Sequence, residues 1–121
     1  MKPFNQEEMY KKMYPNGCWH EEEEDFHISN DTRKCKNCGK WIPINNAREC
    51  LISNPDLLNP SDKEFSMMMD WCLEKGFKIN FGQRKFICCI LTTTNDNNYF
   101  NSALTKYLAL RDAIWAYLEE E

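Results

Sequence analysis

Four residues in the first third of the chain have the types and spacing of metal ligands, namely Cys18-x-His20 and Cys35-x-x-Cys38. Structural zinc sites use Cys and His to fill all four positions of a tetrahedron. A Cys-x-x-Cys turn lets both sulfurs reach one ion, and Gly39 suits such a turn because it tolerates positive φ. Cys18 and His20 point to the same side of an extended segment. The spacing therefore predicts one structural Zn²⁺ per chain, held by these four residues.

Two other interpretations of this segment stay open. His27 or Cys50 could replace His20 as the fourth ligand of the same zinc ion. Alternatively, the Cys-x-x-Cys pair could be a reactive thiol pair. The thioredoxin setting of such a pair, between a strand and a helix, is missing from the surrounding sequence. The spacing favours zinc.

Length and cysteine use place the chain among small intracellular proteins. A chain of 121 residues forms one domain, or one domain with a small zinc appendage. Seven cysteines are an odd number, and Cys88 and Cys89 are adjacent within an apolar run, which disfavours a secreted disulfide scaffold. The first fourteen residues are polar and charged, unlike a signal peptide, and no apolar run could span a membrane. We expect a cytoplasmic protein with Cys72, Cys88 and Cys89 in its core.

Charge is unevenly distributed along the chain. The net charge of −4 argues against a general nucleic-acid-binding protein. Five consecutive acids occupy positions 21–25, whereas basic residues gather around the second cysteine pair. The acids and the basic cluster could face each other across a zinc-linked hairpin. Alternatively, a basic face could meet an anionic partner, with Arg33, Lys36, Arg48 and Arg111 as the candidate contacts.

The chain divides into four segments: an N-terminal helix in 1–15, a zinc-ribbon-like module in 16–44, a connector in 45–60 and a helix–strand–strand–helix sandwich in 61–121. The first helix is expected from Phe4 to Tyr14, with Asn5 as its N-cap. Within the zinc-ribbon-like module, short strands are expected at 26–28 and 33–34. Ser61 and Glu64 form a capping-box sequence that predicts the start of a second helix, and Gly76 marks its end. The fold class is α+β.

The sandwich carries a hairpin whose second strand is unusual. Residues 77–81 alternate apolar with polar, as in a half-buried strand, and a second strand is expected over 84–92. Residues 86–91 are apolar on both faces, which predicts cover above and below this strand. A polar loop is expected over 93–98, followed by a last helix that starts at Asn101 or Ser102. The two helices of the sandwich are expected to cover the two faces of the sheet.

Two strands alone are marginal in water, so further strands must come from the zinc module or from a second copy of the chain. This predicts an oligomer, with Ile114 and Trp115 of the last helix as the contact between copies. Arg111 lies on the apolar side of the same helix. Its aliphatic stem either lies on the core with the guanidinium at the edge, or the guanidinium contacts an anion or a partner.

The chain resembles small phage proteins that join a zinc ribbon to a phage ABA-sandwich domain. The matching segments are Cys18-Trp19-His20-Glu21, Cys35-Lys36-Asn37-Cys38-Gly39-Lys40, Asn54-Pro55-Asp56-Leu57 and Tyr107-Leu108-Ala109-Leu110-Arg111-Asp112-Ala113. The resemblance implies a phage or prophage origin and a setting in the bacterial host cytoplasm. It implies no particular activity, although many small phage proteins of this kind counter bacterial immunity.

These observations favour a binding protein over an enzyme. His20 and His27 are the only histidines, and the sequence contains no catalytic triad, phosphate loop or deaminase signature. We expect a non-enzymatic inhibitor with a structural zinc, which counteracts a bacterial defence system. It would bind a host defence protein or sequester a nucleotide signal. The alternative is a nucleic-acid-binding zinc-ribbon regulator, supported by the basic cluster and opposed by the acidic balance.

Overall fold

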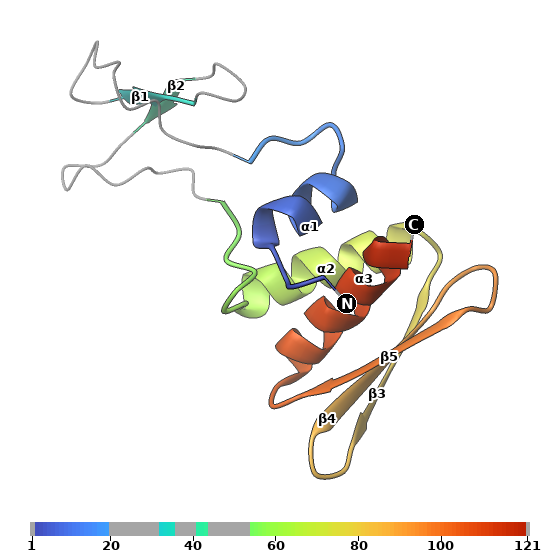
Figure 1. Cartoon of the computed structure of the whole chain (residues 1–121). Coiled ribbons are helices and arrows are strands. Elements are labelled where there is room, and N and C mark those ends of the chain that lie inside the picture. Colours follow the sequence, from blue (N-terminus) through green and yellow to red (C-terminus); the bar gives the residue numbers. More distant parts are fainter. Residues whose placement is uncertain (1, 20–31, 36–40, 44–53, 121) are drawn as a thin grey trace. The chain divides into compact units, whose positions relative to one another are not determined.

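A computed structural model of the chain describes residues 2–19, 32–35, 41–43 and 54–120 (Figure 1). The chain forms two compact units. Unit 1 combines Met1–Met13 with Pro55–Glu121, and unit 2 is Tyr14–Asn54. The N-terminal helix and the end of the expected connector thus belong to unit 1 together with the sandwich.

Unit 1 contains three helices: α1 (Gln6–Met13), α2 (Asp62–Glu74) and α3 (Lys106–Glu120). The predicted cap of α1 is confirmed, because the backbone N–H of Glu8 donates to Asn5 Oδ1 at 3.0 Å. The capping box of α2 is also confirmed. The Ser61 N–H and hydroxyl donate to Glu64 Oε1 at 3.1 and 2.6 Å. Each pairing occupies polar groups that a helix start would otherwise leave without a partner.

The end of α2 turns the chain directly into the sheet. Gly76 has a φ of +77°, its N–H donates to the Leu73 carbonyl at 3.0 Å, and the Phe77 N–H donates to the Cys72 carbonyl at 3.0 Å. This is a Schellman motif, in which glycine takes the left-handed position without a steric penalty. The predicted helix end at Gly76 is confirmed.

The sheet has three antiparallel strands in the order β3-β4-β5: β3 (Lys78–Gln83), β4 (Ile87–Thr92) and β5 (Asn98–Ala103). The expected strands correspond to β3 and β4. The polar loop expected over 93–98 is confirmed up to residue 97. However, β5 occupies the residues where the last helix was expected to start, Asn101 or Ser102, so the predicted helix start was wrong. The turn at 93–97 reverses the chain, with Asp96 at a φ of 62°. The third strand thus comes from residues 61–121 themselves, and the prediction that it comes from the zinc module or from a second copy was wrong.

Helices α2 and α3 both lie on one face of this sheet, which we call the inner face (Figure 1). Phe81 of β3 contacts Phe65 of α2 with ring centroids 6.0 Å apart. Tyr99 of β5 contacts Tyr117 of α3 at 5.5 Å. The expectation that the two helices cover opposite faces was therefore wrong. The two helices pack against each other as well as on the sheet, and unit 1 is a two-layer α+β structure.

In unit 2, β1 (Thr32–Lys34) pairs antiparallel with β2 (Trp41–Pro43). The expected strand at Arg33 and Lys34 is confirmed, and the one expected at 26–28 lies outside the described residues. Lys34 pairs with Trp41, so the Cys-x-x-Cys segment connects the two strands of a hairpin. Among the described residues, no helix has the length and apolar character needed to cross a membrane.

Candidate functional site

Two of the predicted zinc ligands lie next to each other in unit 2. Cys18 Sγ and Cys35 Sγ are 3.7 Å apart although the residues are 17 positions apart in the chain. A disulfide bond would need about 2.05 Å. Two thiolates at ~2.3 Å from one tetrahedral zinc ion would be about 3.8 Å apart. The separation therefore fits two ligands of a shared ion, and the burial of Cys35 fits a closed structural site.

The other members of the predicted set, His20 and Cys38, lie outside the described residues, as do the alternatives His27 and Cys50. Within the part of the chain that the structure describes, no group of three or more Cys, His, Asp or Glu side chains could hold a metal. In the sequence, the Cys-x-x-Cys segment lies between β1 and β2. A bound zinc ion would cross-link this segment to the one that contains Cys18.

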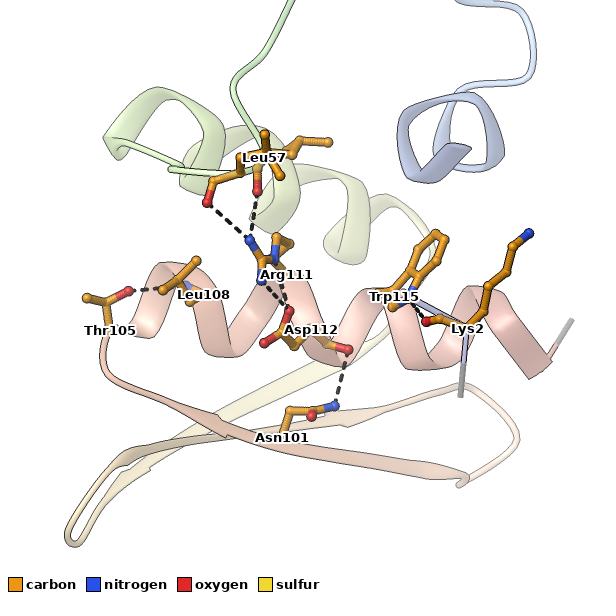
Figure 2. A network of polar contacts seen from close by, with 9 residues as sticks. Lys2, Leu57, Asn101, Thr105, Leu108, Arg111, Asp112 and Trp115 are labelled. Atoms are coloured by element: carbon orange, nitrogen blue, oxygen red, sulfur yellow. Dashed lines mark hydrogen bonds and ion pairs between the residues drawn. The ribbon is translucent and has the colours of Figure 1, made fainter. Parts of the chain in front are cut away.

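Of the four basic residues considered as anion contacts, Lys36 and Arg48 lie outside the described residues, and Arg33 lies in β1 opposite Ile42. Arg111 of α3 is held inside unit 1 (Figure 2). Its Nη1 donates to the carbonyls of Leu57 and Leu58 at 3.0 and 3.2 Å.

The same guanidinium also contacts Asp112 and the Phe4 ring. Its Nη2 and Nε contact Asp112 Oδ1 at 2.8 and 2.9 Å. The guanidinium carbon lies 4.2 Å from the centre of the Phe4 ring, a favourable cation–π position. With these contacts, Arg111 joins three segments of unit 1. This agrees with the interpretation that its stem lies on the core, and a role in binding an external anion would require these contacts to break.

The residues predicted to mediate self-association are also buried within unit 1. Ile114 is 0% and Trp115 3% exposed. The N-terminal segment covers this part of α3: Trp115 Nε1 donates to the Lys2 carbonyl at 3.3 Å (Figure 2), and the Phe4 ring lies 5.5 Å from Trp115. This location for a contact between copies was therefore wrong, because the chain's own N-terminus occupies it.

Within the described part of unit 1, no helix covers the opposite face of the sheet. The strand register gives this outer face nine residues: Lys78, Asn80 and Gly82 of β3, Cys88, Ile90 and Thr92 of β4, and Asn98, Phe100 and Ser102 of β5. Ile90 and Phe100 are cross-strand neighbours at its centre, and they are 38% and 60% exposed. The apolar character of residues 86–91 on both faces predicted cover above and below this strand. Both helices of unit 1 lie on the inner face and Ile90 is exposed, so within unit 1 that prediction was wrong for the outer face.

One end of the outer face is hollowed. A depression of about 420 Å³ is lined by Gly82, Gln83, Arg84, Cys88 and Phe100. Gly82 pairs with Cys88 in the register, and a Cβ added at Gly82 would meet no atom within 4 Å. The absence of a side chain at Gly82 therefore leaves the depression open at this position.

The sheet segment differs in charge from the rest of the chain. Residues 77–106 contain four basic residues and one acid, although the chain as a whole has a net charge of −4. The basic residues are Lys78, Arg84, Lys85 and Lys106, and the acid is Asp96. This positive segment was missed because the sequence reasoning looked for a basic cluster only around the cysteines.

The three cysteines predicted to be in the core separate into two kinds. Cys72 and Cys89 are fully buried, and burial raises the pKa of each thiol to about 12. Their core role is confirmed, and they remain protonated at neutral pH. Cys88 is only half-buried and lies on the outer face, so its assignment to the core was wrong.

Comparison with known protein families, with curated proteins and with solved structures finds no match to this chain.

Proposed function

We propose that this protein is a non-enzymatic binding protein with a structural zinc in unit 2 and its binding surface on the outer face of unit 1. Its role is to counteract a bacterial defence system in the host cytoplasm, by binding a defence protein or sequestering a nucleotide signal. The resemblance to phage proteins supports the setting. The exposed outer face is the observation that carries the binding role.

The outer face fits a contact surface for physical reasons. An antiparallel sheet with one covered face normally presents polar side chains on the other. Here an isoleucine and a phenylalanine are neighbours at the centre of the uncovered face. Apolar groups clustered within a polar rim typically mark a binding surface. A second copy of the chain on this face would also cover them, and native mass spectrometry of the purified protein distinguishes that case.

Capture from bacterial lysate tests this proposal. The wild-type chain is compared with Phe100→Asp on the outer face and with Leu73→Asp, a matched control at an exposed position of α2. We expect the wild type and the control to retain the same protein or nucleotide, and Phe100→Asp to lose it. Retention of the same species by all three proteins would refute the outer face as the contact surface.

A nucleic-acid-binding regulator is the second candidate function. The positive charge of residues 77–106 favours it, because contacts to phosphates need Lys and Arg on one surface. Such binding weakens steeply with salt, since neutralised phosphates release counterions. Salt-sensitive retention on single-stranded and duplex DNA columns therefore separates this candidate from a protein inhibitor.

A further inference from the structure

We propose that the outer face binds single-stranded nucleic acid, with a base stacked on Phe100 and the adjoining phosphates at Arg84 and Lys85. This inference rests on the second candidate function. However, it places the nucleic-acid-binding site on the sheet of unit 1 and not at the basic residues near the cysteines.

The stacking platform is the Phe100 ring. At 60% exposed it has one of the most open aromatic side chains among the described residues. Proteins that bind single strands use aromatic side chains in this way, because every base has a π face. Phe86, at the turn between β3 and β4, is 44% exposed and offers a second ring near the same end of the sheet.

The depression beside Phe100 provides room for a base. Besides Phe100, its lining residues are Gly82, Gln83, Arg84 and Cys88. Gln83 has both donor and acceptor groups that suit the edge of a base.

The rest of the outer face adds amide and hydroxyl groups rather than a broad apolar area. These groups belong to Asn80, Thr92, Asn98 and Ser102, and the Thr92 hydroxyl donates to Asn98 Oδ1 at 2.8 Å. The core of a protein–protein interface is typically more apolar. The composition of the face therefore favours nucleic acid over an acidic protein.

Charge and shape favour a strand over other nucleotide-containing ligands. The turn between β3 and β4 carries Arg84 and Lys85 side by side, both exposed, and Lys78 lies on the outer face near its other end. Arg84 is the only cation among the residues that line the depression. A strand that continues past the depression can place successive phosphates near the remaining cations. A duplex has its bases paired and stacked, so they are not available to Phe100.

Fluorescence anisotropy with the full-length, zinc-loaded protein tests the inference. The probe is a labelled oligothymidine of about 12 nucleotides, within the range of single-strand site sizes. We expect Phe100→Ala to weaken binding about tenfold, as expected for loss of one stacked base, and Phe100→Tyr to retain it. Leu104→Ala is the matched control, because Leu104 is exposed between β5 and α3 and lies off the outer face. Its affinity should equal that of the wild type.

The salt dependence tests the phosphate contact separately. Arg84→Ala should reduce the slope of log affinity against log salt concentration by about one, the loss of one phosphate contact. Lys11→Ala removes an equal charge from α1, where Lys11 pairs with Glu7, and should leave the slope unchanged. Equal slopes for the wild type and Arg84→Ala would overturn the placement of phosphates at this turn.

Three further results would overturn the inference: no binding of the oligonucleotide at low salt, equal affinity for thymidine monophosphate, or equal losses in Phe100→Ala and Leu104→Ala. Capture of a host protein that depends on Phe100, without oligonucleotide binding, would refute this inference and leave the proposed binding role in place. If neither the lysate capture nor the oligonucleotide assay shows binding that depends on Phe100, both this inference and the proposed binding role of the outer face are refuted.

Discussion

Replacing Arg111 with Met tests whether this side chain is structural. Methionine keeps an unbranched stem on the core and removes the guanidinium. The substitution leaves the carbonyls of Leu57 and Leu58 without their donor and removes the ion pair with Asp112. A hydrogen bond from a charged donor contributes about 1.5–3 kcal/mol to stability. The Arg111 side chain is 14% exposed, so solvent screens it only weakly.

Water can partly replace the lost donor at Leu58, which is on the surface. We therefore expect the free energy of unfolding of unit 1 to fall by about 3 kcal/mol, near one strong and one weakened hydrogen bond. For a unit of this size, the melting temperature should drop by roughly 12–24 °C. Thermal unfolding followed by circular dichroism measures this drop, with Lys106→Met on the exposed start of α3 as the control.

A melting temperature for Arg111→Met within a few degrees of the wild type would refute this reasoning. It would show that the guanidinium contributes little to stability and is available to an external anion. An unchanged melting temperature for the control is needed for the comparison, because both variants lose one positive charge from the same helix.

Three further predictions concern unit 2, the end of α2 and the cysteines. Cys35→Ser should lose zinc, whose binding stabilises small modules by about 10–16 kcal/mol. Hydrogen exchange should then rise in unit 2 only, and a uniform rise across both units would contradict their independence. Gly76→Val should lower the free energy of unfolding by about 1–3 kcal/mol, because the backbone at this position has a φ of +77°. Denaturant unfolding measures this loss, and an unchanged midpoint would show that a side chain causes no strain there. At pH 8, iodoacetamide should modify Cys88 well before Cys72 and Cys89, whose raised pKa values of about 12 keep them protonated. Peptide mass mapping that shows equal modification would refute their burial.

Local signals in the sequence predicted the start of α1 and both ends of α2. Asn5, Ser61 and Gly76 act through hydrogen bonds or backbone angles within a few residues of themselves, so their effect can be read without knowing the fold. The spacing of the cysteines likewise predicted that Cys18 and Cys35 share a site, and their sulfurs lie 3.7 Å apart. The zinc ion itself stays a prediction.

Features that depend on packing could not be predicted in this way. The segment that forms β5 contains Asn98 and Asn101, a residue type that is depleted in strands, and its pairing with β4 overrides this preference. The apolar stripe of a helix shows that one side is buried but does not say which face of the sheet it covers. Ile114 and Trp115 illustrate the same limit, because the sequence alone does not show that the N-terminal segment packs over them.

The central claim is that the outer face makes the functional contact. Methyl NMR of isoleucine-labelled protein tests it most directly, by titrating in the species captured from lysate. Ile90 lies on the outer face, and Ile114 is buried in α3 as an internal control. The account predicts that the Ile90 methyl signal shifts or broadens while that of Ile114 stays in place. Binding of the captured species without any change at Ile90 would contradict it.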